Sequence, residues 1–284
     1  LFLHLKQKLP NGYHELLSFV IFLNLFDKIT IQKSSGNDIN LHITGPLANS
    51  LNIPKKDNLI IKVINYIKNN FNITDNLSIT LDKHIPIAAG LGGGSADAAA
   101  VLKGLNTFWN LNLSDTDLIS IAANFGADIP SCIYNKSGLI EGIGEKFTNI
   151  TVNFSLPLLL VNPYMPLSTK DVYNKATIIK ENNKQLNIEL LKSYLEQNNK
   201  TLALNFLNNQ TNNHLSTAAI SLMPEIADIL FNLQQTNPIF SRLTGSGSTC
   251  FAIYESKEKL QKAISLIQKI YPNYFVISAT NLID

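Results

Sequence analysis

The stretch that decides the fold is PIAAGLGGGSADAAA, from Pro86 to Ala100, in which four of the five residues 90–94 are glycine. The segment before it, residues 77–85, alternates apolar and polar residues, as a half-buried strand does. The segment after it, residues 95–105, places alanine, leucine and valine at the spacing of one helix face. The sequence therefore predicts a strand, a glycine-rich turn and a helix in direct succession.

This turn is a candidate anion site. Glycine has no Cβ, so a ligand can approach the main-chain amides closely, and the backbone can adopt a positive φ. The helix that follows directs its free N–H groups and the positive end of its dipole at the same place. Phosphate is the anion most often bound in such a position. The alternative is a turn that only connects two elements. That interpretation does not explain why four glycines are present, since ordering each glycine costs conformational entropy.

Two known phosphate-binding patterns fit this turn poorly. A Walker A loop has Lys followed by Ser or Thr after its last glycine, whereas here the last glycine is followed by Ser95 and Ala96. A dinucleotide fingerprint needs a third glycine where Ser95 stands, and an acidic residue about 20 positions on that ends a second strand. The acids that follow, Asp115 and Asp117, lie at an expected helix start instead.

Composition limits the class of protein. The chain has 284 residues, which favours two modest domains, and 45% of them are hydrophobic. With 23 basic and 21 acidic residues the net charge is +2, so we expect no nucleic-acid partner and no membrane-binding basic face. The apolar run Leu16–Phe26 is shorter than the roughly 20 residues of a membrane span, and no signal-peptide pattern is visible. Cys132 and Cys250 lie in apolar surroundings, which favours reduced, buried thiols and a cytoplasmic location.

An aromatic residue and a histidine follow a Pro-Asn-Gly turn near the start of the chain. Tyr13 and His14 can offer a stacking face and a hydrogen-bonding edge to a planar ligand. The alternative is a tyrosine packed at the start of a strand beside a solvent-exposed histidine. The residues alone favour this second interpretation.

The segment GADIPSC, from Gly126 to Cys132, contains one carboxylate in a largely apolar neighbourhood. Asp128 lies between an expected helix end at Gly126 and an expected turn at Pro130. It is either a helix cap or an acid kept for chemistry, and the residues alone favour the cap.

Hydrophobic periodicity predicts the remaining elements. A second glycine cluster, SRLTGSGSTCFAIY (Ser241 to Tyr254), is interpreted as either a tight hairpin or a ligand loop. Ser114 and Asp117 form a capping-box-like start, and Asp57 or Asn58 caps an earlier helix. Strands are expected at 1–5, 16–32 with a break near Asp27, 38–44, 139–147, 156–161, 250–253 and 274–279, and helices at 59–67, 117–125, 169–176, 190–195, 202–207, 226–233 and 260–267.

Taken together, these stretches resemble the GHMP kinases, the group named for galactokinase, homoserine, mevalonate and phosphomevalonate kinases. PIAAGLGGGSADAAA resembles their phosphate motif, and LTGSGSTCF resembles their C-terminal glycine motif. NGYHEL (Asn11 to Leu16) and GADIP (Gly126 to Pro130) are similar to the branch of the family whose substrate carries a cytidine diphosphate group. The resemblance covers nearly the whole chain in the right order.

The resemblance implies an α+β fold of two domains, expected at residues 1–150 and 151–284. The first would be an N-terminal GHMP kinase domain with a left-handed βαβ unit, and the second a C-terminal GHMP kinase domain with a ferredoxin-like α/β arrangement, with the active site between them. It also implies ATP with Mg²⁺ as cofactor and transfer of the γ-phosphoryl group to the 2-hydroxyl of 4-diphosphocytidyl-2-C-methyl-D-erythritol. Such transfer depends mostly on positioning and charge neutralisation.

Roles for individual residues follow from the resemblance. Asp128 matches the catalytic aspartate, which accepts or steers the proton of the attacking hydroxyl. Tyr13, His14 and Tyr173 match residues around the cytosine ring, which reverses the preference stated above for the first two. The residues expected to bind ATP are Pro86, Ala89, Gly90, Leu91, Gly92, Gly93, Gly94, Ser95 and Ala96, and Gly245, Ser246 and Gly247 are expected to close over the substrate.

The family motif also has a lysine shortly before the segment that LFLH (Leu1 to His4) matches, and that lysine pairs with the catalytic aspartate and the phosphates. The chain begins after that point, so we expect residues upstream of Leu1. No metal ligand is assigned, because glycine replaces the serine that ligates Mg²⁺ in some relatives. The alternatives are a GHMP kinase for another small alcohol such as homoserine or mevalonate, a catalytically impaired ligand-binding relative, and, more distantly, a dinucleotide-dependent oxidoreductase.

Overall fold

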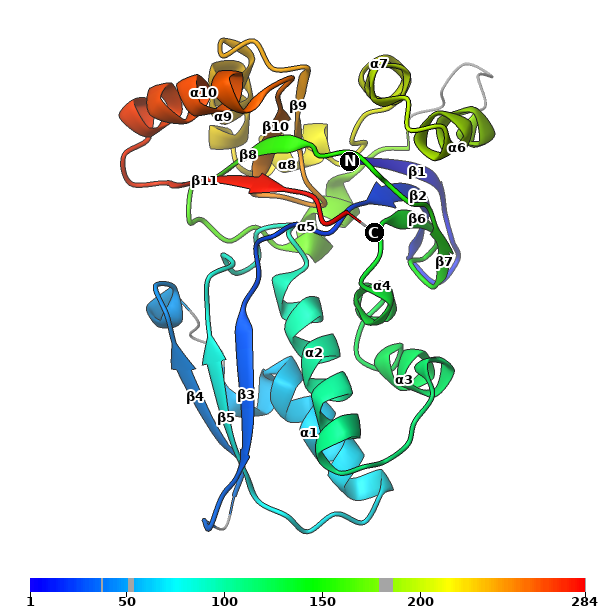
Figure 1. Cartoon of the computed structure of the whole chain (residues 1–284), viewed down its shortest axis with the longest axis vertical. Helices are drawn as coiled ribbons and strands as arrows, with labels where there is room; N and C mark the ends of the chain where they lie inside the picture. The colour runs from blue at the N-terminus through cyan, green and yellow to red at the C-terminus, as the bar shows by residue number, and fades with distance from the viewer. Residues whose placement is uncertain (37, 51–53, 179–185, 284) are drawn as a thin grey trace. The chain divides into compact units, whose positions relative to one another are not determined.

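The computed structural model describes residues 1–36, 38–50, 54–178 and 186–283. The chain forms two compact units, and each unit is assembled from separated segments (Figure 1). The first unit consists of Leu1–Asn24, Ala88–Leu91 and Lys136–Asp284, and the second consists of Leu25–Ile87 and Gly92–Asn135. The expected division of the sequence near residue 150 stays a prediction.

The second unit contains a three-stranded sheet in the order β3-β5-β4, covered by helices (Figure 1). The central strand β5 is antiparallel to β3 and parallel to β4, and α1 connects the two parallel strands, which makes a βαβ unit. Every second residue of β5 is buried, as the period-two pattern predicts. The strands are β3 (Lys28–Lys33), β4 (Asn40–Thr44) and β5 (Leu77–Asp82), and the helices are α1 (Leu59–Asn70), α2 (Gly93–Phe108), α3 (Asp115–Ala122) and α4 (Ile129–Tyr134), with short 3-10 turns η1 (Ala48–Ser50) and η2 (Lys55–Asp57).

Side-chain caps explain where these helices begin. Asn58 accepts a hydrogen bond from the amide of Ile60 at the start of α1, and Ser114 forms a capping box with Asp117 at the start of α3. The capping box was predicted, and of the two caps considered for α1, Asp57 and Asn58, the structure selects Asn58. The turn expected at Pro130 is wrong, because Pro130 is instead the second residue of α4, where its fixed φ suits a first helical turn. A helix of six residues is too short to show a periodic pattern.

The first unit contains two antiparallel four-stranded sheets. One has the order β1-β2-β6-β7, and the other has the order β11-β8-β10-β9. Helices separate β8 from the β9–β10 hairpin, and one helix separates β10 from β11, so the second sheet has the ferredoxin-like βαββαβ arrangement that the resemblance predicts. The strands are β1 (Phe2–Lys8), β2 (His14–Val20), β6 (Gly138–Gly142), β7 (Lys146–Asn149), β8 (Pro157–Asn162), β9 (Phe240–Leu243), β10 (Cys250–Ile253) and β11 (Phe275–Thr280).

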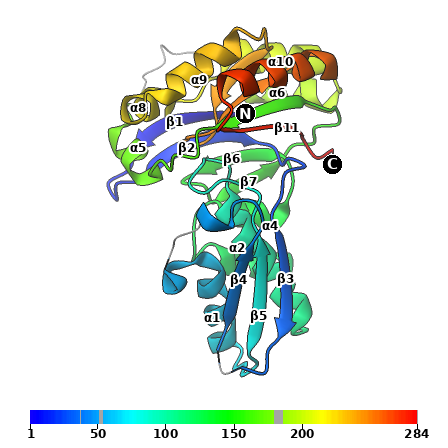
Figure 2. The ribbon, with the colours of Figure 1, turned by 90° about the vertical axis from the view of Figure 1, so that its left-hand side faces the viewer.

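The helices of the first unit enclose its core. All six residues of β8 are buried, and α9 and α10 pack on the sheet that contains it (Figure 2). Helix α8 was not predicted, because its residues STAAISL are short of strongly apolar side chains. The helices are α5 (Thr169–Lys175), α6 (Ile188–Glu196), α7 (Lys200–Gln210), α8 (Ser216–Leu222), α9 (Glu225–Gln234) and α10 (Lys257–Ile270). No helix in the described part of the chain is long and apolar enough to cross a membrane.

Candidate functional site

The glycine stretch joins β5 to α2, as the sequence predicts, and it sets the conformation in which α2 begins. Gly92 is the N-cap residue with φ of +69°, a conformation that glycine adopts at little cost. A Cβ at Gly92 or Gly94 would meet no atom within 4 Å. In the described structure, the amides of Gly93, Gly94 and Ser95 donate to no protein acceptor, whereas the amide of Ala96 donates to the carbonyl of Gly92 at 2.9 Å. Three N–H groups at a helix N-terminus therefore have no protein acceptor, and the space beside Gly92 and Gly94 is open.

The two glycine clusters of the sequence meet within the first unit. The hydroxyl of Thr244 donates to the carbonyl of Gly90 at 3.1 Å, and the amide of Thr249 donates to the carbonyl of Ala89 at 3.0 Å. A Cβ on Gly90 would lie 2.3 Å from the carbonyl oxygen of Thr244, so only glycine fits there. Strands β9 and β10 pair antiparallel on either side of the second cluster, which confirms the hairpin interpretation.

Helix α5 connects this hairpin to His14. The hydroxyls of Thr169 and Ser246 are 2.9 Å apart, and the rings of Tyr173 and His14 are 5.6 Å apart with an interplanar angle of 48°. Gly90, Ser246, Tyr173 and His14 thus belong to one connected set in the first unit. The sequence offered no signal for Thr169 or Thr244, which join the set by hydrogen bonds.

The exposure of Tyr13 and His14 is the reverse of the simpler interpretation given above. Tyr13 is 59% exposed at the turn before β2, and His14 is 6% exposed. Burial, followed by the nearby charge of Lys8, lowers the pKa of His14. The histidine is therefore neutral at pH 7, with one ring nitrogen able to donate and the other able to accept a hydrogen bond.

Asp128 immediately precedes α4, but its side chain makes no capping hydrogen bond. The hydroxyl of Ser131 donates to the main-chain carbonyl of Asp128 at 2.8 Å, and the carboxylate has no partner among the described residues. The residue is solvent-exposed, yet surrounding protein raises the pKa of the carboxyl by desolvation. The helix-cap interpretation is wrong for the side chain, which leaves the carboxylate available for chemistry.

Neither cysteine has the environment of a catalytic thiol. Burial raises the pKa of Cys132 to about 12, and it also raises the pKa of the buried Cys250. Both thiols are free of disulfides, as expected. A reactive cysteine needs a lowered pKa, so these two residues serve packing.

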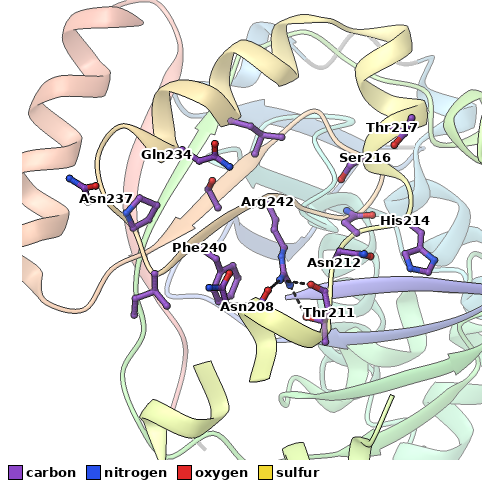
Figure 3. Close-up of a pocket in the computed structure, with 15 residues that line it drawn as sticks. Asn208, Thr211, Asn212, His214, Ser216, Thr217, Gln234, Asn237, Phe240 and Arg242 are labelled. Carbon is purple, nitrogen blue, oxygen red and sulfur yellow. Dashed lines mark hydrogen bonds between the residues drawn. The ribbon is translucent and has the colours of Figure 1, made fainter. Parts of the chain in front are cut away.

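A cavity of about 580 Å³ lies elsewhere in the first unit and contains none of the predicted site residues. Arg242 of β9 points across it toward Thr211 (Figure 3). Its guanidinium donates to the hydroxyl of Thr211 at 2.8 Å and to the carbonyls of Thr211 and Leu207 at 2.6 and 2.5 Å. The arginine thereby ties the end of α7 to β9, a structural role that supports the glycine hairpin.

Comparison with known proteins decides the family. The model for the GHMP kinases N terminal domain matches residues 58–136, and the model for the GHMP kinases C terminal domain matches residues 186–273. The chain belongs to the GHMP kinase family. Two relatives named 4-diphosphocytidyl-2-C-methyl-D-erythritol kinase support this placement. The one from Clostridioides difficile (strain 630) is 36% identical, with 96% of this chain and 90% of the relative covered, and the one from Chelativorans sp. (strain BNC1) is 34% identical with the same coverage.

Solved structures of GHMP kinases share the fold. A 4-(cytidine 5'-diphospho)-2C-methyl-D-erythritol kinase superposes with a TM-score of 0.76 at 22% identity, covering 99% of this chain and 96% of that one. A homoserine kinase from Cytophaga hutchinsonii ATCC 33406 gives 0.73 at 18% identity, covering 94% and 89%. The α+β GHMP kinase fold expected from the sequence is confirmed, and the dinucleotide-dependent oxidoreductase is excluded.

Proposed function

We propose that the chain is an ATP-dependent kinase that phosphorylates the 2-hydroxyl of 4-diphosphocytidyl-2-C-methyl-D-erythritol, a step of non-mevalonate isoprenoid biosynthesis, in the cytoplasm. The observation that carries the acceptor assignment is the relationship to kinases named for this compound at 34% and 36% identity over nearly the whole chain. The division into domains at residues 1–150 and 151–284 belongs to the same proposal.

ATP is the phosphoryl donor of the GHMP kinases. In the proposed site, its phosphates accept hydrogen bonds from the free amides of Gly93, Gly94 and Ser95, where the dipole of α2 favours negative charge. Open space at Gly92 and Gly94 supports this assignment, because it allows phosphate oxygens to approach the backbone. The other residues assigned to this subsite are Pro86, Ala89, Gly90, Leu91 and Ala96.

The acceptor is assigned to residues of the first unit. His14 offers a neutral ring edge that can hydrogen-bond to cytosine, and the rings of Tyr13 and Tyr173 offer faces for stacking. Residues Gly245 to Gly247 close over the acceptor in this proposal. Homoserine and mevalonate contain no base, so a kinase for either compound has no use for this aromatic set.

The chemical step requires little covalent work from the protein. The 2-hydroxyl oxygen forms a bond to the γ-phosphorus, the bond from that phosphorus to the β–γ bridging oxygen breaks, and ADP leaves. Asp128 accepts or steers the proton of the attacking hydroxyl. The exposed carboxylate makes no capping hydrogen bond, so it is free to meet the hydroxyl of a bound substrate, and this supports the role.

Mg²⁺ belongs to this proposal as a companion of ATP. Among the residues that the structure describes, no group of three or more His, Cys, Asp and Glu side chains is placed to hold a metal. Mg²⁺ in kinases is usually held by one or two carboxylates together with the nucleotide phosphates, so an ion that arrives with ATP would not require a larger group of protein ligands. When bound, the ion neutralises charge on the β- and γ-phosphates.

The deciding experiment measures ADP release by the full-length natural protein with ATP and Mg²⁺. Three acceptors are compared: 4-diphosphocytidyl-2-C-methyl-D-erythritol, homoserine and mevalonate. We expect release with the cytidyl compound alone. Release with homoserine or mevalonate would assign a different acceptor, and ATP binding without release for any of the three would favour a ligand-binding relative.

A further inference from the structure

Three charged side chains form a buried cluster in the second unit. The Lys83 ammonium donates to Asp27 Oδ2 at 2.5 Å and to Asp97 Oδ2 at 2.9 Å. The side chains of Lys83, Asp27 and Asp97 are 2%, 1% and 8% exposed. The three residues come from positions as far apart as 27 and 97 in the sequence.

The cluster fixes the backbone on both sides of the glycine stretch. Asp27 Oδ1 accepts hydrogen bonds from the amides of His84 and Ile85, the residues that follow β5, at 2.5 and 2.9 Å. Asp97 belongs to the second turn of α2. Lys83 therefore links the segment that leaves the sheet to the helix that the glycine stretch enters.

The first residue of α2 packs against the parts that the cluster holds. A Cβ on Gly93 would lie 2.9 Å from Cγ2 of Ile85 and 3.5 Å from the ammonium nitrogen of Lys83. Gly93 is buried for this reason, whereas Gly92 and Gly94 on either side are exposed. The position of the first turn thus depends on Ile85 and Lys83, and through them on Asp27 and Asp97.

Charge and burial exclude a direct contact of Lys83 with a ligand. Its ammonium is enclosed and already faces two carboxylates, so the cluster brings no net positive charge to the free amides. Burial raises the pKa of Asp97 to about 6, against the attraction of Lys83, so the carboxylate is ionised at pH 7. Buried ion clusters can often be replaced by apolar residues without loss of stability. A contribution to stability therefore does not by itself explain why Lys83, Asp27 and Asp97 are charged.

We propose that Lys83, together with Asp27 and Asp97, is a positioning residue that holds the first turn of α2 in the arrangement that binds the phosphates of ATP. This role rests on the proposed function, because it presumes that ATP binds at that turn. It adds three residues, none of which touches the nucleotide phosphates, to those on which phosphate binding depends.

The test compares ATP affinity and amide exchange in the full-length protein. The double variant Lys83→Met/Asp97→Asn removes the link without leaving two buried carboxylates opposed. Leu77→Ala is the matched control, since it truncates a buried side chain at the far end of β5 and lowers stability without touching the cluster. Calorimetry gives the dissociation constant for ATP, and hydrogen exchange reports on the hydrogen-bonded amides of residues 96–101. Lys83→Arg is a second variant, because it keeps the charge but replaces a compact donor with a larger planar group.

We expect the double variant and Lys83→Arg to bind ATP on the order of tenfold more weakly, since small displacements of a binding group are costly. Exchange in residues 96–101, whose amides are hydrogen-bonded, should quicken in both, and neither effect should occur in Leu77→Ala. Unchanged ATP affinity in the two cluster variants, or equal weakening in the control, would overturn the positioning role. ATP binding by the natural protein without transfer to the cytidyl compound would overturn the proposed function alone, and absence of ATP binding would overturn both.

Discussion

Asp128 shows how a single residue can be judged by the bonds it does not make. A helix cap makes a hydrogen bond to the helix that it begins, and the Asp128 carboxylate makes none, although the residue directly precedes α4. A carboxylate without a structural partner can be changed at little cost to folding. The sequence alone singled out Asp128 but could not show that its carboxylate lacks a capping hydrogen bond. That property depends on the side-chain rotamer and on the conformation of the turn.

Asp128→Asn is therefore expected to separate catalysis from folding and binding. Loss of a general base lowers kcat by about 10²- to 10⁴-fold, while the free energy of unfolding changes by less than about 0.5 kcal/mol. The dissociation constant for ATP should stay near that of the natural protein. Steady-state kinetics, calorimetry and urea unfolding measure the three quantities.

Asp115→Asn is the matched control, since Asp115 is an exposed carboxylate of the same unit outside the proposed site. It should leave kcat unchanged. Near-normal turnover by Asp128→Asn would remove the aspartate from the mechanism.

At the scale of elements, the glycines of the stretch 90–94 have different tasks, which the sequence alone could not separate. Gly90 is packed against the carbonyl of Thr244 and Gly93 against Ile85, so side chains there would disturb packing. Gly94 faces open space at the second position of α2 and has no positive φ. A substitution at Gly94 therefore tests the proposed phosphate site without disturbing the fold.

Gly94→Val is expected to weaken ATP binding on the order of tenfold or more, because a branched side chain would occupy the space through which phosphates reach the amides. Stability should be unchanged or slightly higher, since glycine is the poorer helix former. Ala100→Val is the control, because it places the same side chain at an exposed position of the same helix. Equal ATP affinity in the two variants would mean that the stretch only connects β5 and α2.

Local sequence patterns predicted most elements, because a strand or helix with one buried face shows its own spacing of apolar residues. Residues 77–82 and 93–108 behave as their alternation and helical spacing indicate. Helices α4 and α8, of six and seven residues, are too short for a clear period to appear. The contact of Gly90 with Thr244 joins residues 154 positions apart, and no local pattern encodes such a pair.

At the scale of the whole molecule, the buried charges make the stability of the second unit depend on pH. Asp27, Lys83 and Asp97 place two carboxylates against one ammonium, so one negative charge is in excess. Burial, which is the largest effect on Asp97, raises its pKa from 3.8 to about 6. The folded state then binds more protons than the unfolded state between these values, and the stability that Asp97 contributes is lost as the pH rises through 6.

Because the pKa of Asp97 is raised on folding, the pH dependence of the free energy of unfolding should differ between the natural protein and Asp97→Asn. Relative to the variant, the natural protein should gain on the order of 2 kcal/mol in free energy of unfolding as the pH falls from 7 to 4, most of the range between the two pKa values of Asp97. Trp109, the single tryptophan, lies at the end of α2 and reports on the second unit during urea unfolding. If the natural protein instead lost stability relative to the variant as the pH falls, the attraction of Lys83 would outweigh the burial of Asp97. The ionised form of Asp97 would then stabilise the folded state.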